Sequence, residues 1–249
     1  MFRSRIVVLM GLLCLLVMVG SSVLAEDIYM KRVMHTDPMT MMGQTQPATD
    51  DTTEMWLSKD AACTITDHGD MLVRMDKGAM YFIDHESKTY FEMPMSLLGA
   101  SKEAVDSMPP SPLAAMMGSI KMTITPTEET KQIGDWMAKR YDVDVNLGFG
   151  TSKSVYWATE DLDVNQEVMT AMTSASMAML PGYEDIVKEM EKVKGVTVES
   201  STEVSMMGAV AKSSEKMLEY ANKTAPAGTF DIPEGYTKTE EHPGMQGME

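Results

Sequence analysis

Five short segments between residues 54 and 92 alternate apolar and polar side chains and are separated by tight turns. In one of them Met71, Val73 and Met75 fall on one side of the chain, and the residues between them fall on the other. Connections such as Lys77-Gly78 are typical of hairpins. The segments are 54–58, 62–66, 71–76, 79–84 and 88–92. A chain with this pattern folds as an antiparallel meander, which makes the protein mainly β.

Further strands and three helices are predicted outside the meander. The predicted strands are 28–35, 120–127, 131–136, 138–147, 153–158, 196–203, 205–213 and 229–236, and the predicted helices are 97–108, 163–180 and 183–194. Residues 37–53 contain turn-forming residues without a period and predict a long loop. Because no long linker interrupts the pattern, we expect one α+β domain over residues 26–238, followed by a flexible tail of residues 239–249.

Residues 1–25 are typical of a cleavable secretory signal peptide. Arg3 and Arg5 precede an apolar run, and Val23-Leu24-Ala25 supplies a small-residue cleavage pattern. The run of about 14 residues is shorter than the ~20 needed to span a bilayer. Cys14 lies inside the run and not at the cleavage point, so lipidation is not expected. We therefore expect a mature chain that is periplasmic or secreted and has no stable membrane anchor.

The acidic composition excludes several classes of partner. The chain has 21 Lys and Arg against 37 Asp and Glu, a formal charge of −16. Removal of Arg3 and Arg5 with the leader makes the mature chain two units more negative. Such a surface repels nucleic acid and anionic lipid headgroups, so neither is an expected partner.

No catalytic motif is present. The chain contains no His-Glu-x-x-His, Gly-x-Ser-x-Gly or Cys-x-x-Cys sequence. His68 and His85 lie in turns beside aspartates, and we favour solvated turn residues over a metal pair or a catalytic base. Cys63 is the one cysteine outside the leader, and we interpret it as a small buried apolar residue, with a reactive thiol or an intermolecular bridge as the alternative. We expect no enzymatic activity and no cofactor.

Methionine is unusually frequent, with 29 residues in the chain. Many occur at periodic positions, where they either fill an ordinary core or line an adaptable, lipid-sized cavity. The candidate ligand-binding residues of this group are Met71, Met75, Met80, Met122, Met172, Met179 and Met206.

A second group of methionines shows no period and lies beside histidines. Thioethers and imidazoles together suit Cu(I) or Ag(I), although methionines placed in loops by composition alone would look the same. The candidate metal ligands are His35, Met39, Met41, Met42, His242, Met245 and Met248.

Several short motifs occur in a characteristic order. They are Lys88-Thr-Tyr-Phe-Glu-Met-Pro94, Thr123-Ile-Thr-Pro-Thr127, Tyr141-Asp-Val143 and Phe230-Asp-Ile-Pro-Glu-Gly-Tyr236. In this order the chain resembles an uncharacterised family of exported bacterial proteins, a domain of unknown function that is similar to the periplasmic lipoprotein carriers LolA and LolB. The resemblance covers roughly residues 27–238 and implies a curved antiparallel unclosed half-barrel, with helices packed over the concave face and an apolar concavity beneath them.

Two functions of different classes are therefore expected. The first is a soluble exported binding protein that holds an apolar ligand, such as an acyl chain, a lipid or a lipoprotein, in the concavity. The second is a periplasmic protein that handles Cu(I) or Ag(I) through its Met and His loops. A structural domain without a ligand is the third interpretation.

Overall fold

Twelve strands of the described residues form a single large sheet. The computed structural model describes residues 27–41, 44–67, 69–95, 120–147, 150–164, 168–170, 183–206 and 208–240. The sheet contains β1 (Ile28–Thr36), β4 (Thr49–Leu57), β5 (Ala61–Ile65), β6 (Gly69–Arg74), β7 (Ala79–Asp84), β8 (Thr89–Pro94), β9 (Lys121–Ile133), β10 (Trp136–Asn146), β11 (Gly150–Thr159), β12 (Val196–Met206), β13 (Ala209–Asn222) and β14 (Thr237–Thr239). A separate hairpin joins β2 (Met39–Met41) to β3 (Gln44–Gln46).

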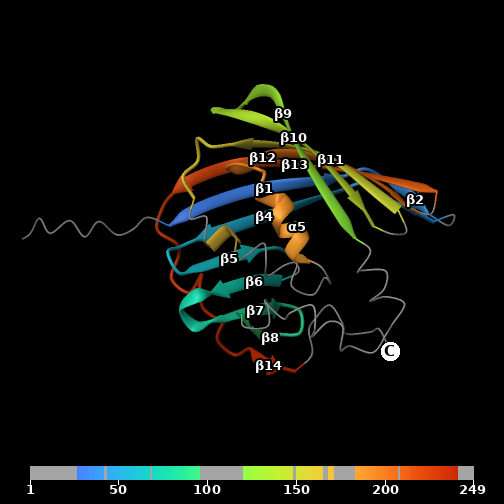
Figure 1. Cartoon of the computed structure of the whole chain (residues 1–249). Helices are drawn as coiled ribbons and strands as arrows, with labels where there is room; N and C mark the ends of the chain where they lie inside the picture. Colours follow the sequence, from blue (N-terminus) through green and yellow to red (C-terminus); the bar gives the residue numbers. More distant parts are fainter. Residues whose placement is uncertain are drawn as a thin grey trace, which may run out of the picture.

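The sheet is open, and nearly all of its strand pairs are antiparallel. The strands lie in the order β14-β8-β7-β6-β5-β4-β1-β13-β12-β11-β10-β9, so that β14 and β9 are its two edges. Only the short β14 pairs in parallel, with β8. In Figure 1 the sheet curves from β9 at the top to β14 at the bottom, and the two edges do not meet. The predicted mainly β class and the large unclosed antiparallel sheet are confirmed.

The predicted meander corresponds to β4–β8, in which each strand pairs with the next along the chain. The first strand, β1, lies in the middle of the sheet between β4 and β13. It therefore joins the meander to the long strands β9–β13 of the second half.

Several details of the predicted strands are wrong. The turn expected between the strands 196–203 and 205–213 lies after Met206, and β13 continues to Asn222. Residues 37–53 were expected to form a loop, but β4 begins at Thr49 and pairs with β1 as far as Thr36. The β-branched Thr49, Thr52 and Thr53 fit an extended strand, which is why β4 continues so far. The predicted strands 120–127 and 131–136 are one long strand, β9, whose pairing with β10 is irregular near Lys139.

The last prediction to fail is the strand 229–236. Residues 224–236 form turns and irregular chain, which we call the strap, and pairing resumes only at Thr237. Pro226 and Pro233 lack the amide hydrogen that a strand would use, so turns are favoured over a continuous ladder here.

Few helical residues are described. The prediction of a helix at 183–194 agrees with α5 (Tyr183–Met190), after which the chain turns. Of the predicted helix 163–180, residues 168–170 are helical and residues 163–164 are not, while residues 165–167 and 171–180 lie outside the described residues. The predicted helix 97–108, the leader 1–25 and the tail from residue 241 also lie outside them. Within the described part of the chain, no helix is both long and apolar enough to cross a membrane.

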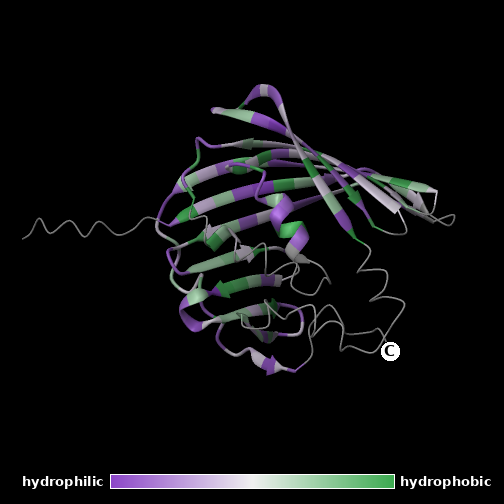
Figure 2. Ribbon diagram, viewed as in Figure 1, coloured by the Kyte–Doolittle hydropathy of each residue, from purple (hydrophilic) through white to green (hydrophobic). Residues whose placement is uncertain are grey.

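Two cross-strand rows of apolar side chains cover one face of the meander, which we call the methionine face. The first row is Met30, Met55, Thr64, Met71, Phe82 and Phe91; the second is Ile28, Leu57, Ala62, Val73, Met80 and Met93. The apolar residues of both rows belong to one cluster, in which Met30 and Met80 are completely buried. Figure 2 shows apolar colour recurring along these strands.

The opposite face of the meander, which we call the aromatic face, is covered by residues of the strap. Its central row is Tyr29, Trp56, Cys63, Leu72 and Tyr81. Ala225, Phe230, Ile232 and Tyr236 of the strap pack against this row. The irregular strap therefore buries apolar surface that a strand sequence alone would leave open to water.

Candidate ligand-binding site

Helix α5 packs over the second half of the sheet. Met190 and Val193 contact a cluster on β9–β11 that includes Tyr141 and Val143. Polar contacts fix the helix in place as well. The Ile124 amide donates a hydrogen bond of 2.8 Å to Glu189 Oε2, and the Lys194 amide donates one of 3.2 Å to the Tyr141 hydroxyl.

The chain leaves α5 through a tight turn at Gly195. This residue has φ +81°, and a Cβ atom on it would clash with the Thr159 carbonyl oxygen. Only glycine adopts this conformation without strain and allows such a close approach. Gly195 thereby sets the position of α5 relative to β11 and β12.

A cavity of about 540 Å³ lies between α5 and the sheet, and we call it the α5 cavity. Its apolar wall is formed by Met169, Val187, Met190 and Val193, and its floor includes Arg32, Tyr156 and Thr197. Its volume falls within the range of roughly 300–1,000 Å³ that is usual for small-molecule sites.

The floor of the α5 cavity continues the methionine face. Arg32 follows Met30 by two residues along β1, so the two side chains lie on the same side of the strand. A cross-strand row on this face joins β1 to β10 and consists of Met34, Glu215, Ser200, Tyr156 and Tyr141. The apolar methionine rows and the α5 cavity therefore share one face of the sheet.

A smaller pocket of about 320 Å³ adjoins the α5 cavity, and we call it the polar pocket. It shares Arg32, Tyr156 and Thr197 with the α5 cavity. The rest of its lining consists of Met34 and five polar residues: Ser200, Thr202, Ser213, Ser214 and Glu215. One end of the combined space is therefore apolar, and the other end is polar.

Arg32 lies where the two ends meet. Its side chain is 15% exposed, and Nη1 is 3.6 Å from Glu215 Oε2. Its Nε is buried and has no hydrogen-bond partner among the described residues. Burial raises the pKa of the nearby Tyr156 hydroxyl, and the negative charge of Glu215 raises it further.

Another hollow, of about 530 Å³, lies over β10–β13 on the opposite face. Half of its lining residues are charged, among them Arg140, Asp142, Glu203 and Lys212. These groups pair with one another: Lys212 Nζ is 3.2 Å from Glu203 Oε2, and Arg140 Nη2 is 2.8 Å from Asp142 Oδ1. A surface with this many charged groups offers little to an apolar ligand.

The structure distributes the predicted ligand-binding methionines over different places. Met71, Met75 and Met80 pack in or against the methionine-face cluster. Met122 packs against the α5 cluster on β9–β11, whereas Met206 ends β12. Met172 and Met179 lie outside the described residues. None of the described members of this set lines the α5 cavity.

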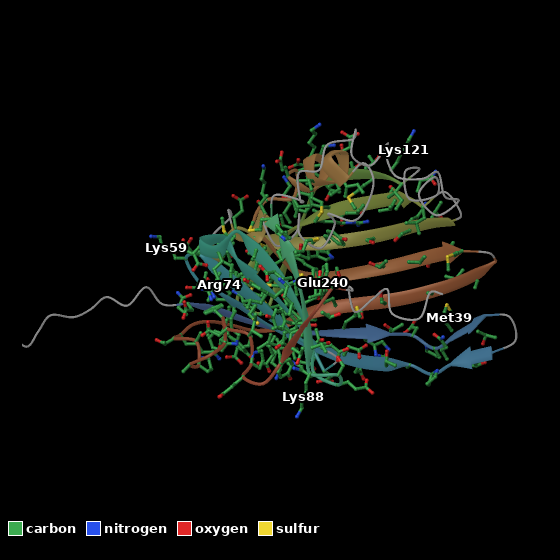
Figure 3. All side chains as sticks on the ribbon, turned by 90° about the horizontal axis from the view of Figure 1, so that it is seen from below. Met39, Lys59, Arg74, Lys88, Lys121 and Glu240 are labelled. Atoms are coloured by element: carbon green, nitrogen blue, oxygen red, sulfur yellow. The ribbon has the colours of Figure 1, made fainter. Side chains whose placement is uncertain are left out.

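The predicted metal ligands are described only in part. His35 Nδ1 is 2.7 Å from Asp50 Oδ1, and its Nε2 is 3.3 Å from Asp37 Oδ1. Figure 3 places Met39 well apart from Glu240, the last described residue of the predicted tail 239–249. Met42, His242, Met245 and Met248 lie outside the described residues, and the description of Met41 is limited to its backbone. Among the described residues, no group of three or more His, Cys, Asp or Glu side chains could hold a metal ion.

The most distinctive residue of the site, Arg32, was not among the residues predicted from the sequence. One signal for it was present: the strand alternation puts Arg32 on the same side as the apolar Ile28 and Met30. Burial of a charged guanidinium among apolar side chains is costly unless an anionic group pairs with it. An arginine at such a position is therefore a candidate for binding an anionic group.

No family model and no curated protein matches the chain. Two solved structures show distant likeness. PNGF-II, in a C2 crystal form, is 10% identical over 86% of this chain and 31% of its own, with a TM-score of 0.38. This chain therefore spans about a third of the length of that protein. A DUF1329 family protein from Desulfovibrio piger ATCC 29098 is 8% identical over 90% of this chain and 93% of its own, with a TM-score of 0.29.

These two likenesses carry no argument about fold or function, because both TM-scores are low. The resemblance to LolA and LolB stays a prediction.

Proposed function

We propose that this protein is an exported binding protein that holds an apolar ligand, such as an acyl chain or a lipidated partner, between α5 and the sheet. In this proposal α5 is one of the helices that cover the concave face of the unclosed half-barrel. The observation that carries it is the α5 cavity of about 540 Å³, whose wall is formed by Met169, Val187, Met190 and Val193.

The physical basis is the transfer of apolar ligand surface from water into this cavity. At about 25 cal/mol per Å², burial of roughly 200 Å² contributes about 5 kcal/mol before the costs of association. Methionine and valine supply a wall without charge, and the two methionine side chains adapt to chains of different shape. The adjoining polar pocket leaves room for a polar end of the ligand.

Filling the cavity tests the proposal. We expect wild-type protein to bind the neutral fluorophore N-phenyl-1-naphthylamine, and Val187→Trp to weaken binding by about tenfold or more because the indole occupies the space. The matched control is Lys188→Gln, at the next position of the same helix, because this side chain is exposed and its ion pair within the described part of the chain is with Asp185. Thermal unfolding checks that both variants fold. Absence of binding by the wild type, or equal binding by Val187→Trp, would contradict the proposal.

Export is tested separately. The mature chain should begin at Glu26 and be recovered in a soluble fraction outside the cytoplasm. Intact-mass analysis of protein from its own host measures this directly, and retention of residues 1–25 in a membrane pellet would contradict it.

A further inference from the structure

We propose that Arg32 binds the carboxylate of the ligand, so that the α5 cavity takes the anion of a single-chain fatty acid. This inference rests on the proposed function and adds the chemical class of the ligand. The acyl chain would lie under α5, and the head would lie at the junction with the polar pocket.

The first argument is the incomplete pairing of Arg32. A guanidinium that is 15% exposed has lost most of its hydration, and a charge in that position needs compensation. Its ion pair with Glu215 is 3.6 Å long, whereas charge-assisted N–H to O hydrogen bonds are about 2.7–2.9 Å. Nε also has no hydrogen-bond partner among the described residues. Glu215 alone therefore does not satisfy the hydrogen-bond donors and the charge of Arg32.

The second argument is position. Arg32 is shared by the α5 cavity and the polar pocket, together with Tyr156 and Thr197. An amphiphile whose tail contacts Val187 and Met190 therefore has its head beside the guanidinium, with the serine and threonine hydroxyls of the polar pocket around it. Of the ligands that fit an apolar chain space, one with an anionic end matches this arrangement best.

The third argument is the distribution of charge. The planar guanidinium matches a carboxylate, which accepts two parallel hydrogen bonds. Glu160, Glu191 and Lys194 also line the cavity, but they are exposed, and solvent and salt screen them. Glu215, by contrast, is close enough to compete with a ligand carboxylate for Arg32, which makes it the second residue to test.

The experiment compares ligands that differ only at the head. Binding of dodecanoate, 1-dodecanol and dodecylamine is measured by displacement of N-phenyl-1-naphthylamine at pH 8, below the micellar range, with wild type, Arg32→Gln, Arg32→Lys and Glu215→Gln. Wild type should bind dodecanoate about tenfold more tightly than the alcohol, and the amine should bind no more tightly than the alcohol. Arg32→Gln should abolish the preference for the acid, because it weakens binding of dodecanoate about tenfold more than it changes binding of the alcohol.

The two further variants keep the test decisive if Arg32→Gln fails to fold. Arg32→Lys should retain part of the preference, because it keeps the charge without the planar fork. Glu215→Gln should increase the preference for dodecanoate over the alcohol several-fold, because it removes the competing carboxylate. Equal affinity of wild type for acid and alcohol, or an unchanged preference in Glu215→Gln and Arg32→Lys, would overturn the role of Arg32 and leave the apolar site intact. Failure of wild type to bind any of the three ligands or the fluorophore would instead overturn the proposed function.

Discussion

Arg74 donates a hydrogen bond of 2.6 Å from Nη1 to the carbonyl oxygen of Phe230, which lies 156 positions later in the chain. The same guanidinium also donates hydrogen bonds to the carboxylates of Asp76, two residues further along the chain, and of Asp231 in the strap. A second contact joins His85 Nδ1 to the Tyr236 hydroxyl at 2.8 Å. These two contacts hold the strap over the aromatic face, while its apolar residues supply the buried area.

Loss of the Arg74 contact should loosen the strap. We expect Arg74→Met to lower the free energy of unfolding by about 1.5–3 kcal/mol, the usual range for hydrogen bonds to a charged group. Urea unfolding measures the change, and limited proteolysis should show earlier cleavage within residues 224–236. The control is Arg140→Met, because the ion pairs of Arg140 among the residues that the structure describes are with the half-exposed Asp142 and the exposed Glu129. Its effect should stay within about 1 kcal/mol, and an equal loss in both variants would contradict a special role for the strap contact.

Two methionines in different environments should respond very differently to truncation. Met80 is completely buried in the methionine-face cluster, whereas Met137 is 52% exposed. We expect Met80→Ala to cost about 2–5 kcal/mol of stability, because it removes buried surface and leaves a cavity. Met137→Ala should change stability by less than about 0.5 kcal/mol. Similar values for the two in chemical denaturation would show that Met80 is not a core residue.

The alternation of apolar residues was sufficient to predict the meander, because each strand of β4–β8 ends at a turn, although it did not predict how far β4 extends. The same reasoning placed Met71 and Val73 on one side, and the structure puts both in the methionine-face rows. An alternation with a period of two residues indicates which side of a strand is buried. It can be recognised from residues that are neighbours in the sequence, without knowledge of distant contacts.

The remaining features depend on partners that are distant in the chain. The strap is irregular, and its cover of the aromatic face depends on Arg74 and Phe230 meeting across the sheet. The α5 cavity combines residues of β1, β11 and β12 with α5, and no local pattern indicates that Arg32 and Val187 line one space. The sequence therefore predicted methionines as the site, but among the described residues the cavity includes different ones, Met169 and Met190.

Cys63 should behave as a buried residue and not as a reactive thiol. It is 3% exposed on the aromatic face. Burial raises the pKa of its thiol to about 12, with a further contribution from the charge of Asp70. Because the thiolate is the reactive form, labelling by a thiol reagent at pH 8 should be very slow in the folded protein and fast in urea. Rapid labelling without denaturant would contradict this and reopen the interpretation as a reactive thiol.

The last prediction concerns Tyr29, which lies beside Trp56 on the aromatic face. Burial raises the pKa of the Tyr29 hydroxyl to about 12, and the hydrogen bond to Glu54 and the charge of Glu54 add to the effect. The folded state therefore holds this proton more tightly than the unfolded state, whose tyrosines ionise near pH 10. The stabilisation is complete below pH 10 and is lost as the pH rises from about 10 to about 12.

Spectrophotometric titration of the phenolate measures this shift, with Tyr29→Phe as the difference control that isolates one tyrosine from the others. Glu54→Gln should lower the pKa of Tyr29 only part of the way towards 10, because burial is the largest cause and remains in the variant. The wild type should also lose more stability than Tyr29→Phe between pH 10 and pH 12, since the variant has no proton to release at that position. A normal pKa for Tyr29, or an alkaline loss of stability that is identical in the two proteins, would show that the ring is hydrated in solution and that the strap side of the sheet is open to water.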